Sequence, residues 1–515
     1  MGSYRIIDAD VCIVGGGGAG MVAAIRAREM GVEKVVVLER NKMLGGSSRC
    51  FSSIMGINTP MHRRYGIHID IPKVFLEQMK VQNWNSNAKL VSRWYNTSGE
   101  VFAWLEGLGV VFTELLDSGN YGDRDFLMQH VSHGLGINIG AQICRHLEPR
   151  LKELGVEVLR STPGRHLIAE DGVVKGVLAE GPDGTVQVNA KRVLISTGSI
   201  SYNQELVRTL VDPRRLGDIT ICEAAKPFNN GEGYTMAKEV GAKTGNITVM
   251  YCGPHQHPYS NAVCTLMRRP SVMAVNANGE RYVNESIISA GGGYQWMRGN
   301  ALQQQKKQVE YTIVDSAYLK QMIEHPQYES VLEKTLAIGN FGANRYQEDN
   351  ITGEINMQKL SVGQRRAWLG VIMDDLRSEA EAGRVLIADT LDEVAAWIGA
   401  DPDTLKNEVA KYNQACEFGY DGEFGKEAKN LRPVKTPPYY VIKAWQGADN
   451  FIGGVQIDHR LRVLGQDDEP IEGLYCAGVT ASGFVGYGYS YPGTESSFAI
   501  TSGYMAAQEM VEGLL

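Results

Sequence analysis

A glycine loop between two short apolar runs is the feature that most constrains how this 515-residue chain can fold. Residues 10–14 are mostly apolar, residues 15–20 read Gly-Gly-Gly-Gly-Ala-Gly, and residues 21–30 have helical character. A second apolar run at 35–38 ends at Glu39, 19 residues after the last glycine of the loop. Strand, glycine turn, helix, strand and acid follow one another in the order of a dinucleotide-binding βαβ unit.

Each glycine in the loop has a predicted role. Gly15 allows the sharp turn, Gly17 lets the backbone approach a pyrophosphate, and Gly20 lets the helix pack on the strand. The helix N-terminus supplies free N–H groups and partial positive charge for the phosphates. Glu39 can accept hydrogen bonds from both ribose hydroxyls and disfavours an extra 2′-phosphate. The alternative is a glycine turn that only links strand to helix.

Composition and charge exclude several classes of protein. Lys and Arg total 51 against 59 Asp and Glu, a formal charge of −8, so the chain has no basic footprint for nucleic acid or anionic membrane. No apolar stretch is long enough to span a bilayer, and the first residues do not look like a secretory signal. The eight cysteines include no CxxC pair, which predicts reduced thiols, no metal site and a cytoplasmic location.

The rest of the chain changes its pattern several times. Turns at Asp171-Gly172 and Asp183-Gly184 predict hairpins leading into a strand at 193–195, and short strands are expected again after Pro437-Pro438. Helices are predicted at 329–336, at 391–412 and at about 497–512. This order predicts an α/β fold in which both chain ends build a nucleotide-binding domain and a separate domain is inserted between them.

A second glycine cluster favours FAD over NAD as the cofactor. Gly45-Gly46-Ser47-Ser48 follows Glu39 closely, where an extended cofactor would meet another turn. The hairpins before Thr197-Gly198 and the late run Leu474 to Gly478 fit the same pattern.

Taken in order, the motifs resemble the flavoprotein family of fumarate reductases and succinate dehydrogenases, which includes urocanate reductase and the 3-ketosteroid dehydrogenases. These motifs are VCIVGGGGAG, Glu39-Arg40, LGGSS, STG, NNGEGYTMA, VNANGERYVNE, IGGVQID and GLYCAG. The resemblance implies a Rossmann-like FAD-binding domain of the glutathione-reductase type (1–256 and 451–515) with an inserted α+β capping domain (257–450). The implied FAD contacts are Gly15, Gly17, Gly18, Ala19, Gly20, Glu39, Arg40, Gly45, Gly46, Ser47, Ser48, Gly198, Gly478, Ser496 and Ser497.

The resemblance also implies an active site between the cap and the isoalloxazine ring. His257, in Gln256-His257-Pro258, matches a substrate-binding histidine, and a loop-capping histidine is the alternative. Ser289 stands where fumarate reductases have a proton-donating arginine, and Thr265 replaces a relay glutamate, although Arg268 keeps one relay position.

Two further departures concern the substrate. The histidine that precedes the family's Gly-Gly-Val motif is replaced within 449–454, and the arginine-bearing clamp becomes residues 485–493. The guanidinium groups suited to a bidentate dicarboxylate clamp are therefore missing from these positions, which argues against fumarate or succinate.

Tyrosines occupy the replaced clamp. Tyr491-Pro492-Gly493 is similar to the stretch of 3-ketosteroid dehydrogenases in which tyrosine and a glycine N–H bind a ketone oxygen. Tyr487, Tyr489 and Tyr491 alternate, so an extended strand would present them on one side, although a ladder packed beneath the sheet would show the same pattern. Tyr294, after a glycine run, is another candidate acid or base.

The last helix is predicted to begin near Ser496-Ser497. In the family this N-terminus points at the N1/O2 edge of the flavin, as the helix dipole favours. Because a carboxylate would be unfavourable beside reduced flavin, we expect Glu495 to turn aside.

The predicted function is hydride transfer between flavin N5 and the β-carbon of a carbonyl-activated C–C bond, either as an enone or enoate reductase or as a ketone desaturase. The candidate catalytic residues are Tyr491, His257, Arg268, Tyr294 and Tyr489. The predicted partners are a small molecule with a C=C or CH–CH bond next to a carbonyl and a separate electron donor or acceptor. A fumarate-type reductase using Arg268 and Arg269, or a non-catalytic binding protein with the same fold, are the alternatives.

Overall fold

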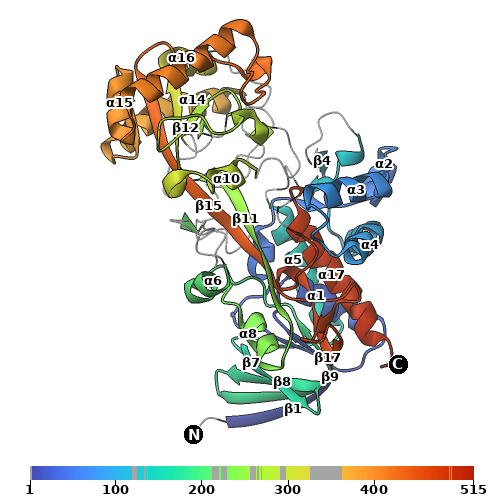
Figure 1. Ribbon diagram of the computed structural model, residues 1–515. Coiled ribbons are helices and arrows are strands. Elements are labelled where there is room, and N and C mark those ends of the chain that lie inside the picture. The colour runs from blue at the N-terminus through green and yellow to red at the C-terminus, as the bar shows by residue number, and fades with distance from the viewer. Residues whose placement is uncertain are drawn as a thin grey trace.

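The computed structural model describes residues 3–116, 118, 124–132, 135, 137–211, 220–221, 229–255, 263, 266–267, 269–289, 297–324, 362–486, 488 and 490–514. Figure 1 shows a lower part that holds both ends of the chain and an upper part, the cap, built from the middle of the sequence. Two long strands, β11 (Thr244–His255) and β15 (Tyr439–Val455), run between them.

The lower part is built on an eight-stranded sheet whose central strands are parallel. Strand β1 lies between β2 and β9, with Cys12 opposite both Val36 and Val193. Residues 11–14 of β1 are fully buried or nearly so, as expected for a parallel strand covered on both faces. The strands are β1 (Ser3–Val14), β2 (Val35–Leu38), β6 (Glu157–Leu159), β7 (Gly164–Glu170), β8 (Val173–Gly181), β9 (Gly184–Ile195), β16 (Arg462–Leu464) and β17 (Pro470–Cys476).

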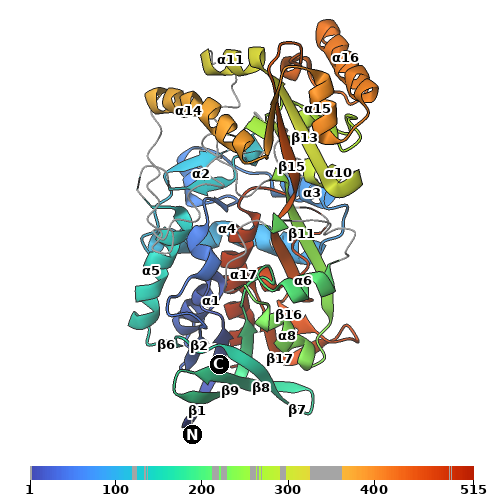
Figure 2. The same cartoon turned by 90° about the vertical axis from the view of Figure 1, so that its left-hand side faces the viewer.

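Helices α1, α5 and α17 lie side by side against this sheet (Figure 2). The α1–α17 contact is close, because a Cβ atom added to Gly503 would lie 2.2 Å from the carbonyl oxygen of Ala19. The helices of the lower part are α1 (Gly18–Glu29), α2 (Pro60–Arg64), α3 (Ile71–Val81), α4 (Ala88–Gly107), α5 (Ile139–Glu153), α6 (Gln204–Leu210), α8 (Glu232–Glu239) and α17 (Thr494–Val511). A small sheet of β3 (Ile54–Met55), β5 (Gln129–Val131) and β4 (Glu114–Leu116) lies beside them.

The cap contains a mixed sheet centred on β15. The first half of β15 pairs with β13 and β14, and its second half pairs with β11, so one strand belongs to both parts of the molecule. The other strands of this sheet are β10 (Thr220–Ile221), β12 (Met273–Asn276), β13 (Val309–Asp315) and β14 (Val385–Ala388). The cap helices are α10 (Met297–Leu302), α11 (Ser316–Glu324), α14 (Val362–Glu381), α15 (Leu391–Ile398) and α16 (Pro402–Phe418).

The predicted α/β class, the glycine turn and both hairpins are confirmed. The short strands expected after Pro438 are wrong, because β15 runs unbroken for 17 residues. The helix predicted near 391–412 is two helices, and the last helix begins at Thr494. The helix predicted at 329–336 lies outside the described residues. Strands β11 and β15 approach or cross the domain boundaries at 256/257 and 450/451, which stay a prediction.

Candidate cofactor site and active site

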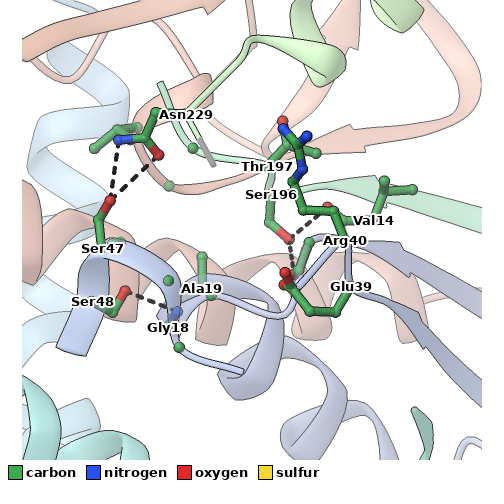
Figure 3. Close-up of a pocket in the computed structure, with 18 of the residues that line it drawn as sticks. Val14, Gly18, Ala19, Glu39, Arg40, Ser47, Ser48, Ser196, Thr197 and Asn229 are labelled. Carbon is green, nitrogen blue, oxygen red and sulfur yellow. Dashed lines mark hydrogen bonds between the residues drawn. The ribbon is translucent and has the colours of Figure 1, made fainter. Parts of the chain in front are cut away.

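A long pocket of about 890 Å³, open mouth included, lies at the carboxyl ends of β1, β2 and β9 (Figure 3). This size falls within the range of ligand-binding pockets, and the end of parallel strands is where α/β sheets bind their ligands. Its lining includes twelve of the fifteen predicted cofactor contacts: Gly15, Gly17, Gly18, Ala19, Glu39, Arg40, Gly45, Gly46, Ser47, Ser48, Gly198 and Gly478.

The first glycine loop has little space for side chains except toward the pocket. Gly15 has φ of +105°, and an added Cβ would lie 2.5 Å from the carbonyl oxygen of Ser196. A Cβ on Gly20 would lie 1.9 Å from the carbonyl oxygen of Gly15, so α1 can pack at this distance only with glycine. In contrast, the nearest atom to a Cβ on Gly17 is 4.0 Å away, which leaves room for a ligand to approach the backbone.

The second glycine cluster is joined to the first by hydrogen bonds. The N–H of Gly45 donates to the carbonyl of Gly16 at 2.8 Å, and Ser48 Oγ accepts from the N–H of Gly18 at 2.9 Å. Ser47 Oγ lies 3.2 Å from Asn229 Nδ2, on the opposite side of the pocket (Figure 3). The two loops therefore form one continuous wall.

One end of the pocket carries the predicted ribose acid. Glu39 Oε2 accepts from the N–H of Gly16 and Oε1 from the N–H of Asn41, each at 2.8 Å. Burial raises the pKa of Glu39, while these two hydrogen bonds favour its ionised form. Beside it, Arg40 and Glu232 form an ion pair at 2.7 Å.

The other end is lined by Gly198, Gly478, Asn450 and Glu495. The expectation that Glu495 turns aside is wrong: Glu495 lines the pocket, and Asn450 Nδ2 donates to its carboxylate oxygens at 3.1 and 3.3 Å. An amide partner across the pocket end outweighs the unfavourable position of the charge in the unliganded chain.

Gly20, Ser496 and Ser497 do not line the pocket. Ser496 Oγ donates to the carbonyl of Ser53 at 2.7 Å, and Ser497 Oγ accepts from Trp94 Nε1 at 3.0 Å. These buried serines fasten the first turn of α17, and cofactor contacts by them stay a prediction.

The residues present fit FAD. A carboxylate at the end of β2, a glycine turn with open space at Gly17 and the N-terminus of α1 match the ribose and pyrophosphate of a dinucleotide. The pocket then continues past Ser48 to Asn450 and Glu495, which leaves this end for the flavin half. When bound, FAD supplies hydride transfer.

Among the candidate catalytic residues, Tyr491 is described, whereas His257, Arg268, Tyr294 and Tyr489 lie outside the described residues. Tyr491 is 2% exposed and directly precedes α17, with its ring centroid 5.8 Å from that of Phe126. Burial, and next the nearby Tyr491, raise the pKa of Tyr95 well above its usual value, so both phenols stay neutral near pH 7. Tyr491 does not line the cofactor pocket itself.

Gln82 holds the segment before Tyr491, and the sequence analysis missed it. Its side chain is fully buried; Nε2 donates to the carbonyl of Gly488 at 2.6 Å and to Ser490 Oγ, and Oε1 accepts from the N–H of Gly486. These partners are more than 400 residues away in sequence, so no local pattern could have revealed them.

The buried arginines of the cap at 281 and 298 are engaged by carboxylates. Arg298 binds both oxygens of Glu310, at 2.9 and 2.5 Å, and all of these side chains are fully buried. Arg281 binds Glu285 and Asp421 at 3.0 Å each. These two guanidinium groups are therefore committed within the cap and are not available to clamp a dicarboxylate.

Comparison with known proteins agrees with this site. Residues 10–494 match the protein family described as FAD binding domain, and the chain belongs to this family. It is 26% identical to vinyl phenol reductase of Lactiplantibacillus plantarum, over 96% of this chain and 94% of that protein. It is also 26% identical to fumarate reductase (cytochrome) of Shewanella frigidimarina, over 97% of this chain and 76% of that protein.

A solved structure shares the whole fold. The 3-ketosteroid Δ1-dehydrogenase from Sterolibacterium denitrificans, in complex with 1,4-androstadiene-3,17-dione, superposes with a TM-score of 0.70 at 19% identity, covering 98% of this chain and 99% of that one. The predicted fold class and the FAD cofactor are confirmed. The chain is a FAD-dependent oxidoreductase that acts on CH–CH bonds.

Two negative findings apply to the described part of the chain. No helix there is both long and apolar enough to cross a membrane. No group of three metal-ligating side chains occurs among the same residues.

Proposed function

We propose that this enzyme acts on a C–C bond conjugated to one uncharged or singly charged oxygen group, such as an enone, an enoate or a vinyl phenol. Tyr491 would donate a hydrogen bond to that oxygen, and charge that develops there would be stabilised. Direction, reduction of C=C or desaturation of CH–CH, depends on the electron partner, because one site serves both.

The observation that carries this proposal is the neutral surroundings of Tyr491. It packs near the phenol of Tyr95 and the ring of Phe126, and Gly493 two residues later is fixed because its carbonyl accepts from the N–H of Met55 at 3.1 Å. The committed guanidinium groups of Arg281 and Arg298 point the same way. A phenol suits a neutral or phenolic oxygen better than a pair of carboxylates.

A small unsaturated carboxylate such as fumarate is the second candidate, and the similarity to fumarate reductase (cytochrome) favours it. It would require arginines other than Arg281 and Arg298. Arg269 is described and 1% exposed, and Arg268 lies outside the described residues.

The test is an anaerobic reoxidation experiment. The purified protein is photoreduced and mixed with an enone, a vinyl phenol, an acrylate and fumarate in parallel, while the visible flavin absorbance is followed. Reoxidation by the enone or vinyl phenol and not by fumarate is expected, and Tyr491→Phe is expected to slow it. Fast turnover of fumarate alone would contradict the proposal, and a purified protein without flavin absorbance would favour a non-catalytic binding protein.

We further propose a separate electron donor or acceptor and a reducing cellular compartment. The cysteines at 12, 50, 144, 416 and 476 are free thiols, which supports reducing surroundings.

A further inference from the structure

Glu495 is an acidic side chain at the flavin end of the cofactor pocket. It stands in the first turn of α17, an 18-residue helix, and lines the same pocket as the two glycine loops. The other charged side chains of the described lining are Glu39, Arg40 and Glu232, of which Arg40 and Glu232 pair with each other. Glu39 marks the opposite, ribose end of the pocket.

Asn450 fixes the position and charge of Glu495. Its Oδ1 accepts from Ser201 Oγ at 2.5 Å and from the N–H of Phe451 at 2.9 Å, which determines that Nδ2 faces Glu495. A carboxylate that accepts from an amide N–H and stands in the first turn of a helix is stabilised in its ionised form. The chain therefore holds a negative charge where the flavin half fits.

We propose that Glu495 sets the reduction potential of the bound FAD and the number of protons taken up on reduction; this rests on FAD binding as described above and deepens the proposed function. Reduction adds two electrons to the site, and the Glu495 carboxylate opposes the negative charge they bring. Two protons from solvent, rather than one, accompany the two electrons, because Glu495 either accepts the second proton or forces it onto its neighbour. The potential is lowered as a result.

The test measures the midpoint potential of bound FAD against pH around neutrality, by equilibration with reference dyes, and needs no substrate. A tenfold change in the equilibrium constant of a two-electron couple corresponds to about 30 mV. Two protons per two electrons therefore give a slope of about 60 mV per pH unit, and one proton gives about 30 mV. The wild-type chain is expected to show the steep slope.

Glu495→Gln is expected to halve the slope and to favour reduced FAD by at least tenfold, or about 30 mV, at neutral pH. Glu495→Asp keeps the charge and should keep the steep slope. Glu512→Gln is the matched control, because it removes the same charge from the far end of α17, about 25 Å away at 1.5 Å per residue, and should leave slope and potential unchanged.

A wild-type slope of one proton, or a Glu495→Gln variant that matches the wild type in slope and potential, would overturn the proposal. If Glu495→Gln does not bind FAD, Asn450→Ala decides: loss of the amide donor should raise the potential, and an unchanged potential contradicts the role of the pair. The substrate panel fails or succeeds independently of these values, so the two proposals can be separated.

Discussion

The cofactor pocket and the interior of the cap use charge in opposite ways. The pocket is built mostly from glycine backbone and short polar side chains, and two of its charged groups pair at its edge. The cap instead buries complete ionic groups, with the side chains of Arg298, Glu310, Glu285 and Lys426 all fully buried. Backbone that recognises phosphate needs close approach, whereas buried charges need several partners from distant elements.

The largest effect is expected where the pocket depends on backbone contact. Gly20→Ala would place a Cβ 1.9 Å from the carbonyl oxygen of Gly15, and neither atom can move without displacing α1. We expect loss of FAD binding and of soluble protein, measured by flavin content and yield. Gly17→Ala is the control: its Cβ meets open space, so the chain should fold while binding FAD more weakly. Equal behaviour of the two variants would show that the close approach is not what matters.

The cap should be most sensitive to loss of one partner in a buried ion pair. Arg298→Ala leaves Glu310 buried without its guanidinium group, which costs about 3–5 kcal/mol. The loss should appear as reduced thermal stability with FAD still bound. Arg377→Ala is the control, since its ion pair with Asp374 is exposed and worth at most about 1 kcal/mol.

The same cap cluster should respond to acid. Despite burial, which acts in the opposite direction, Lys426 and Arg281 hold the pKa of Glu285 at about 2. A carboxylate whose pKa is depressed on folding stabilises the fold above its unfolded pKa of about 4.3 and loses this contribution as pH falls toward the folded value. We expect the unfolding temperature to decline below about pH 4.3 and Glu285→Gln to flatten that decline. An equal decline in the variant would place the acid sensitivity elsewhere.

At the ribose end, Glu39→Gln should weaken FAD binding by a smaller amount. The amide replaces a charged acceptor whose hydrogen bonds are worth about 1.5–3 kcal/mol, or about 10- to 150-fold in Kd. Since burial raises the pKa of Glu39, wild-type affinity should also fall as pH drops through that raised pKa, and the variant should not show this dependence. Titration of the apoprotein with FAD at several pH values measures both effects.

The smallest effect is expected from the support of the tyrosine segment. Gln82→Glu replaces the N–H groups that bind Gly488 and Ser490 by an acceptor, and should shift Tyr491 slightly. We expect kcat to fall about tenfold with FAD content unchanged, because small displacements of a positioned group are costly for rate. Lost flavin together with lost activity would mean that Gln82 supports the whole fold instead.

The contrast between pocket and cap also explains what could be predicted. The turn at Gly15, the acid at Glu39 and the Gly45 cluster lie within 31 residues, and the backbone geometry they require restricts the residue types allowed. The position of Glu495 was predicted wrongly, because its partner Asn450 comes from a strand 45 residues earlier in the sequence. Gln82 has no motif of its own, and its role depends on partners near the other end of the chain.

The sequence alone therefore determined the class of fold, the dinucleotide turn and the kind of cofactor, since local backbone conformations limit which residues can stand there. Tertiary structure decided which charges face the pocket, which arginines are consumed within the cap and how the tyrosine segment is held. Those outcomes depend on side chains brought together from distant elements, and hydrogen bonds and ion pairs form only where the packed fold places both partners.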